Sequence, residues 1–140
     1  MSQIFIKRSF IMKNYHPLFL KLGALYNIIW GAWIVFFPLQ IFKMTGMKVP
    51  LYPEIWQCVG MIVGVYGIGY YFASQNPLTH WPIVFVGLLG KILGPLGFLN
   101  ALILERFSPL FGWVILTNDL IWWIPFGHIL WHAWKKAQQV

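Results

Sequence analysis

The sequence predicts an all-α integral membrane protein, a bundle of four transmembrane helices with both termini in the cytoplasm. Of its 140 residues, 59% are hydrophobic and only 9% are charged, and the mean hydropathy is +0.69. The apolar residues form four stretches of the length that a bilayer requires, about 20 residues each. This composition leaves no room for a soluble domain. The predicted spans are residues 18–37, 54–73, 81–104 and 110–134.

The first span follows a basic stretch that includes Lys7, Arg8 and Lys13. Its apolar run is long and reaches Pro38 without a small-residue cleavage site, so we interpret it as a retained helix and not as a signal peptide. The predicted parts of the chain are a basic interfacial tail over residues 1–17, the membrane domain over residues 18–134, and a basic tail over residues 135–140.

Basic residues are unevenly distributed between the two ends of the predicted bundle. Six flank the side of the termini: Lys7, Arg8, Lys13, Lys21, Lys135 and Lys136. Three flank the opposite side: Lys43, Lys48 and Arg106. By the positive-inside rule, this predicts a multi-pass membrane protein with cytoplasmic termini. The net charge of +7 then reflects topology and contact with anionic lipids, and it forms no groove-lining patch for nucleic acid.

Glycines and prolines in the later spans predict how the helices pack. Glycine stripes of helical spacing occur in the second and third spans: Gly60, Gly64 and Gly67, then Gly87, Gly90, Gly94 and Gly97. Such stripes let helix backbones approach closely, so we expect the first three spans to pack through small-residue faces. Pro95 and Pro125 each remove a backbone donor, which predicts a kink or local unwinding at both.

The single cysteine, Cys58, excludes an internal disulfide and a multi-cysteine metal site. It lies within the second span, where we expect a buried and inert thiol.

Polar residues within the spans provide the strongest indication of function. Lys91 lies near the middle of the third span, where a cation needs a partner, a water-filled site or a functional role. Asp119 in the fourth span is its predicted counter-charge, because their depths differ by only about 7 Å. Asn27 and Asn118 are the other polar residues that we assign to a candidate ligand site.

Aromatic residues and one acidic residue complete the candidate ligand site. Trp30, Trp122 and Trp123 lie deeper than the tryptophans of the interfacial belts and suit either a packed core or a flat or elongated lipophilic ligand. Glu54 follows a proline at the start of the second span, which is a helix-start signal. Its functional interpretation is a polar mouth at the outer surface, leading to Lys91 and Asp119.

His128 and His132 are one helical turn apart near the end of the fourth span. Both could address one metal ion or a haem, but no further ligand helix is evident and nearby tryptophans indicate an interfacial band. We therefore predict no cofactor, with metal or haem at this pair as the lesser alternative.

Four sequence segments resemble a known family: YNIIWGAWIVFFP, YPEIWQCVGMIVGVYGIGY, HWPIVFVGLLGKILGPLGF and LTNDLIWWIPF. Together they resemble uncharacterised small bacterial inner-membrane proteins with four helices, over most of residues 22–130. Some of these proteins carry the label alkyl hydroperoxide reductase. A peroxiredoxin-type peroxidase needs a reactive cysteine in a soluble thioredoxin-like domain, whereas Cys58 lies in an apolar helix. The resemblance thus implies fold and membrane location and supplies no catalytic residue.

Three functional hypotheses follow. The first is a non-catalytic membrane module that binds a lipophilic ligand or a larger membrane complex. The second is an intramembrane enzyme that uses Lys91 and Asp119 on a lipid, quinone or isoprenoid-like substrate, although no GxSxG, P-loop or HExxH motif is present. The third is a small transporter with Asp119 as its proton-coupling residue. The expected partners are membrane lipids. The protein assemblies expected from the sequence are a homo-oligomer of this chain or a larger membrane complex that it joins.

Overall fold

The chain is all-α and has the helices of a multi-pass membrane protein, which confirms the predicted fold class. A computed structural model describes the backbone of residues 2–138 and the side chains of residues 15–138. Within these residues, four helical segments are long and apolar enough to cross a membrane. They are Tyr15–Phe36, Pro53–Ala73, Trp81–Ile103 and Pro109–Ala137. Each agrees with a predicted span to within three residues at either end.

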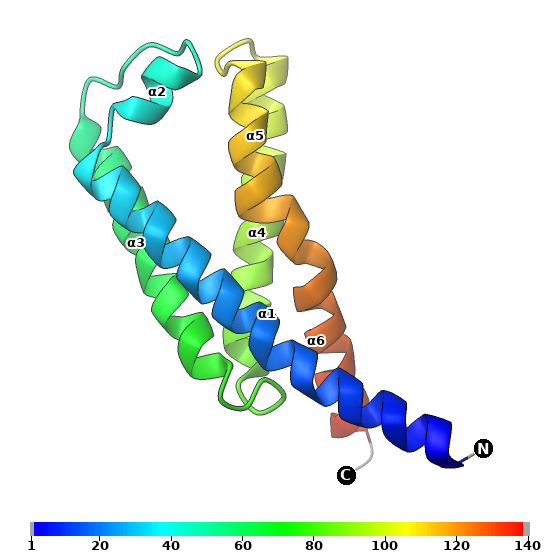
Figure 1. The fold of residues 1–140 in the computed structure, drawn as a ribbon. Coiled ribbons are helices and arrows are strands. Elements are labelled where there is room, and N and C mark those ends of the chain that lie inside the picture. Colours follow the sequence, from blue (N-terminus) through cyan, green and yellow to red (C-terminus); the bar gives the residue numbers. More distant parts are fainter. Residues whose placement is uncertain (1, 139–140) are drawn as a thin grey trace.

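The helical elements form two hairpins that approach each other toward the end that holds the chain termini and splay apart toward α2 and α5 (Figure 1). The first pairs α1 with α3, and the second pairs α4 with the helical rod from η1 to α6. The elements are α1 (Ser2–Phe36), α2 (Gln40–Met44), α3 (Pro53–Ala73), α4 (Trp81–Ile103), η1 (Pro109–Phe111), α5 (Gly112–Ile115), η2 (Leu116–Leu120) and α6 (Ile121–Ala137). Helix α1 includes residues assigned above to an interfacial tail, and the relation of those residues to the membrane stays a prediction.

The start of α1, the end of α6 and the α3–α4 connection lie at one end of the molecule, while α2 and the α4–η1 connection lie at the other (Figure 1). This arrangement is the one that four successive spans require. We call the first end the terminal end and the second the loop end. The assignment of the terminal end to the cytoplasm stays a prediction from charge.

Local sequence signals explain where the helices begin and end. Helix α1 stops two residues before Pro38, and α3 begins at Pro53, with Glu54 in its first turn. Gly46 has a φ of 67° and ends α2 in a Schellman motif, in which Met47 N–H donates to the Phe42 carbonyl over 2.9 Å. These prolines and the glycine mark the boundaries of the first hairpin.

Close contact between α1 and α3 depends on glycine. A Cβ atom on Gly31 would lie 2.5 Å from the Gly60 carbonyl oxygen and 2.9 Å from the Gly64 nitrogen. A Cβ on Gly67 would lie 2.9 Å from the Ala24 carbonyl oxygen. The two backbones therefore touch along this line, as the glycine stripe of the second span predicted.

The glycine stripe of α4 behaves differently from the prediction. Gly87 receives the buried Tyr70 ring from α3, and Gly94 receives the Asp119 carboxylate from η2. A Cβ on Gly90 or Gly97 would meet no described atom within 4 Å, so the expectation of a packing face at those two positions is wrong. The reason is helical phase: positions seven apart are nearly aligned, whereas positions three apart are rotated by about 60°.

The sequence predicted a kink or local unwinding at Pro95 and Pro125; neither helix unwinds there, and a kink stays a prediction. Helix α4 continues through Pro95, and α6 continues through Pro125. The irregular turn lies ahead of Pro125 instead, where residues Leu116–Leu120 form a π-helix. A π turn widens the helix and offsets its hydrogen bonds, and such turns are frequent at functional positions.

Cys58 is exposed on the outer surface of α3 and is not buried between helices as expected. The packed line of α3 runs through Gly60 and Gly67, and Cys58 is rotated by about 160° from Gly60. Its thiol therefore faces the lipid side of the bundle.

Candidate functional site

A polar centre, formed by Lys91, Asn118 and Asp119, lies where α4 packs against η2. Lys91 and Asp119 are 4% and 6% exposed, so both are buried within the helical bundle. Lys91 Nζ donates a hydrogen bond to the backbone carbonyl of Asn118. Within the described residues the lysine and the aspartate do not form a direct ion pair: the lysine binds the peptide adjacent to Asp119.

The contact between α4 and the rod is reciprocal at Lys91. Pro95 has no N–H, so the carbonyl of Lys91, four residues earlier, loses its usual helical donor. The indole Nε1 of Trp123 supplies a replacement, donating to the Lys91 carbonyl over 2.8 Å. Lys91 thus donates through its side chain to η2 and accepts through its backbone from α6.

The π turn explains the opposite half of this contact. Two of its carbonyls accept hydrogen bonds from side chains: the Asn118 carbonyl accepts from Lys91 Nζ, and the Thr117 carbonyl accepts from Trp122 Nε1 over 3.1 Å. Lys91 Nζ also lies 5.8 Å from the centroid of the Trp122 ring. In a membrane, a backbone carbonyl without a donor is costly, so these bonds stabilise an irregular turn at depth.

Asp119 and the two asparagines occupy different positions around this centre. Asp119 accepts from Asn118 Nδ2 over 3.1 Å and packs against Gly94, the residue three positions after Lys91. Asn27 is 2% exposed and packs against Gly67 on α3. The Oδ1 atoms of Asn27 and Asn118 are buried and accept no hydrogen bond from the described residues.

The deep tryptophans separate into two groups. Trp122 is buried in the core with Tyr70 and Phe126, and both Trp122 and Trp123 use their indole N–H groups on backbone carbonyls. Trp30 instead lines a groove at the loop-end half of the bundle. Glu54 is exposed at the start of α3, where its position fits a helix-start residue.

The groove is about 360 Å³ and lies between the first hairpin and the rod of the second. Its lining comprises Tyr26, Trp30, Trp33, Ile41, Met44, Thr45, Leu110, Trp113, Val114 and Thr117. Its wall contains one polar pair, in which the Tyr26 hydroxyl donates to Thr117 Oγ1 over 3.0 Å. Lys91 and Asp119 are not among the lining residues.

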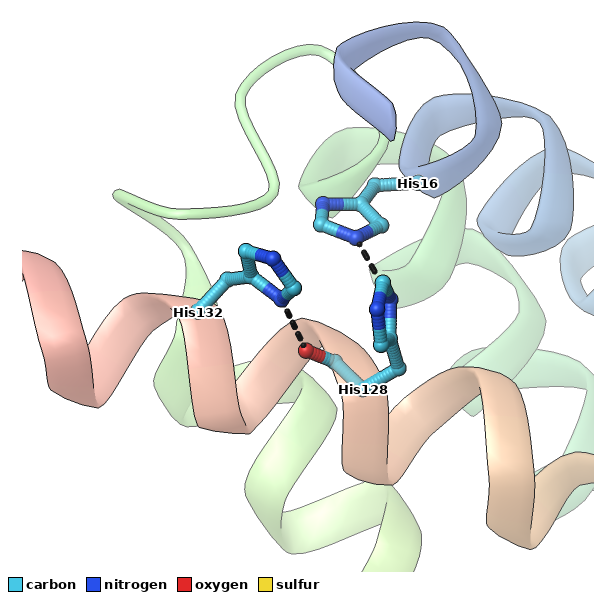
Figure 2. Close-up of side chains that lie close together, drawn as sticks. All are labelled: His16, His128 and His132. Carbon is cyan, nitrogen blue, oxygen red and sulfur yellow. Dashed lines mark hydrogen bonds between the residues drawn. The ribbon is translucent and has the colours of Figure 1, made fainter. Parts of the chain in front are cut away.

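A histidine cluster, formed by His16, His128 and His132, lies toward the terminal end (Figure 2). One ring nitrogen from each histidine can be chosen so that all three lie within 4.8 Å of one another. His16 comes from α1, and the other two come from successive turns of α6. His16 Nε2 and His128 Nδ1 share a hydrogen bond of 3.0 Å, and His132 Nδ1 donates to the His128 carbonyl over 2.9 Å.

His16 is the residue of this cluster that the sequence reasoning missed. The expectation that no further helix offers a ligand is wrong, because α1 brings His16 beside His128 across 112 positions of the chain. The available signal was depth: His16 lies just before the predicted first span, and His128 and His132 lie near the end of the fourth. Antiparallel neighbours place those two ends at the same membrane level.

Comparison of the chain with protein-family models, with curated proteins and with solved structures finds no match. The four long apolar helices agree with a small four-helix membrane protein. The site therefore has to be interpreted from its own geometry.

Proposed function

We propose that this membrane protein is a non-catalytic module that binds a lipophilic molecule in the groove between its two hairpins. The observation that carries the proposal is the groove itself, of about 360 Å³ and lined by three tryptophans. Sites for small molecules are typically of this size, mostly apolar, with a few polar groups that fix orientation. The proposed setting is the bacterial inner membrane, in keeping with the family resemblance and the distribution of basic residues.

The lining of the groove indicates what kind of molecule fits. Trp30 and Trp33 come from α1, and Trp113 comes from α5, so indole rings approach from both hairpins. Large rigid rings provide contact area for a flat or elongated apolar ligand at a low cost in conformational entropy. The Tyr26–Thr117 pair offers hydroxyl groups to one polar end of such a ligand.

The exposed surroundings of the groove support entry from the bilayer. Trp113 is 69% exposed, Met44 is 64% exposed and Leu110 is 56% exposed. In a membrane these side chains contact lipid, so a ligand dissolved in the bilayer reaches the groove laterally. Binding of this kind needs no aqueous channel through the bundle.

The polar centre supports the binding module more than the enzyme or the transporter. The ammonium of Lys91 is bound by the Asn118 carbonyl, and Asp119 is bound by the Asn118 amide. Neither side chain lines the groove. We infer that Lys91 and Asp119 hold the irregular rod against α4 and thereby position Thr117 and Val114 in the groove wall. The homo-oligomer and the larger membrane complex stay predictions.

A filling variant tests the proposal. A decyl-substituted benzoquinone serves as the probe, because it combines a flat polar ring with an apolar chain. Val114→Trp places a large ring in the groove and should lower the probe's affinity at least tenfold, as measured by native mass spectrometry of the full chain released from detergent. Val65→Trp is the matched control, because Val65 is 65% exposed on α3 and does not line the groove.

Retention of the helical content and thermal midpoint of the wild type would show that Val114→Trp is folded. Equal probe binding by the wild type and both variants would contradict the groove as the binding site. Absence of saturable binding to the wild type would contradict a ligand of this class.

A further inference from the structure

We propose that His16, His128 and His132 form a binding site for a divalent transition-metal ion of the Zn²⁺ class. This site is separate from the groove, because no residue of the cluster lines the groove. It joins α1 to α6 near the terminal end of the molecule (Figure 2). The proposal does not depend on a lipophilic ligand.

The spacing of the ring nitrogens is close to that of a metal site. Zinc–nitrogen bonds of about 2.0–2.1 Å in a tetrahedron place ligand nitrogens about 3.4 Å apart. Here His16 Nε2 and His128 Nδ1 are 3.0 Å apart, and the chosen nitrogens of all three rings lie within 4.8 Å. The widest separation in the cluster therefore exceeds the tetrahedral spacing by at most about 1.4 Å, which small changes of the side-chain angles can close.

Hydrogen bonding orients His132 for coordination. A carbonyl oxygen only accepts, so the bond of 2.9 Å to the His128 carbonyl fixes a proton on His132 Nδ1. In the neutral ring, Nε2 then carries the free lone pair. Metal-binding histidines characteristically donate from their other ring nitrogen to a carbonyl or carboxylate, which fixes both tautomer and orientation.

The His16–His128 contact resembles two histidine ligands of one metal ion, with a shared proton in place of the ion. One of the two nitrogens donates and the other accepts. A divalent ion that bound both nitrogens would take the place of that shared proton, and the donor ring would shift to its other neutral tautomer, with its proton on the ring nitrogen that does not bind the ion. His16 is only 6% exposed, so its ring is packed and its hydrogen-bonded nitrogen has restricted freedom to move.

The surroundings define the class of ion. Imidazole nitrogen is the donor that zinc, copper and nickel prefer, whereas magnesium and calcium prefer oxygen. Three histidine ligands leave a fourth position for water, as in open zinc sites. His128 and His132 lie one turn apart on the same face of α6, so these two residues do not bind opposite faces of one haem iron.

The ammonium of Lys135, close to the cluster in the sequence, contacts an aromatic ring. Lys135 Nζ lies 3.8 Å from the centroid of the Trp131 ring and is held there by a cation–π contact. Trp131 in turn lies edge-on to His132, with ring centroids 5.0 Å apart. The aromatic ring thus separates this ammonium from the imidazoles.

The test uses the full chain purified in detergent, with Zn²⁺ and Co²⁺ as probes. The wild type should bind one ion per chain by elemental analysis after gel filtration, and Co²⁺ should give the intense visible bands of a tetrahedral site. His16→Ala and His132→Ala should each weaken binding at least tenfold. His80→Ala is the matched control, because His80 is the one remaining histidine of the chain and lies exposed in the α3–α4 connection.

A second variant keeps the proposal testable if an alanine variant fails to fold. In a Cys58→Ser background, His16→Cys retains a metal ligand and should add a sulfur-to-cobalt charge-transfer band to the spectrum. Zinc binding by the wild type that survives loss of His16 and His132 together would overturn the site. So would failure of the folded wild type to bind either ion, or loss of binding in His80→Ala alone.

Discussion

Replacement of Lys91 by methionine removes the ammonium that binds the Asn118 carbonyl while preserving most of the side-chain volume. The buried carbonyl then lacks its donor, which costs about 1–3 kcal/mol. Asp119, 6% exposed, also loses its nearby positive charge, although the two side chains form no direct ion pair within the described residues. We therefore expect Lys91→Met to lower the free energy of unfolding by about 1–3 kcal/mol, the cost of the unpaired carbonyl.

The assay is equilibrium unfolding in mixed micelles, titrated with SDS and followed by far-UV circular dichroism. Lys21→Met is the control: Lys21 is exposed, so its replacement should change the free energy of unfolding by less than about 0.5 kcal/mol. Asp119→Asn keeps an acceptor for Asn118 Nδ2 and removes the charge. The double variant, Lys91→Met with Asp119→Asn, should thus be at least about 1 kcal/mol more stable than the sum of the two single losses in unfolding free energy predicts. Strict additivity, or a Lys91→Met variant as stable as wild type, would refute the role assigned to the polar centre.

Three further predictions concern the packing of α1 on α3, the hydrogen bond to the Lys91 carbonyl, and the membrane topology. Gly31→Ala should destabilise the protein by about 1–3 kcal/mol, because the new Cβ would meet backbone atoms of α3. Gly64→Ala should be nearly neutral, because a Cβ there meets no described atom within 4 Å. Equal losses in thermal unfolding would contradict the described α1–α3 contact. Trp123→Phe should lower the free energy of unfolding by about 0.6–1.7 kcal/mol. The loss should be smaller in a Pro95→Ala background, because residue 95 then supplies the backbone N–H that the Lys91 carbonyl lacks. An equal loss in both backgrounds would show that the indole hydrogen bond is unimportant. A fluorescent protein that matures only in the cytoplasm, fused after the last residue, should fluoresce, whereas activity of a periplasmic reporter there would reverse the predicted orientation.

Much of the fold was predictable because hydropathy and helix length are properties of local sequence. Four apolar stretches gave the four spans, and Pro38 and Pro53 gave helix boundaries that the structure has to within a few residues. The α1–α3 contact was also predictable, since glycines at helical spacing are a direct signal of close backbones.

The details of the polar centre depend on a local irregularity that periodicity does not reveal. Equal rise along ideal helices predicts that Lys91 and Asp119 lie at similar depth. The π turn changes the phase of the rod, so Lys91 binds the carbonyl of Asn118 while Asp119 packs against Gly94. The roles of these residues as a ligand site stay predictions.

The groove and the histidine cluster depend on tertiary placement. The groove exists because α2 and α5 lie on opposite sides of it, and no local pattern specifies that distance. The cluster exists because His16 meets His128 across most of the length of the chain. Its i and i+4 half was visible in the sequence, whereas the third histidine required the packing of α1 on α6.

The central claim is that the groove between the hairpins holds a lipophilic molecule. The most direct measurement is a high-resolution structure of the full chain extracted with its native membrane lipids and without detergent. The account predicts continuous density for one ordered molecule between Trp30, Trp33 and Trp113, with its polar end near Thr117. A groove closed by contact of the two hairpins, or filled by a side chain of a second copy, would contradict it.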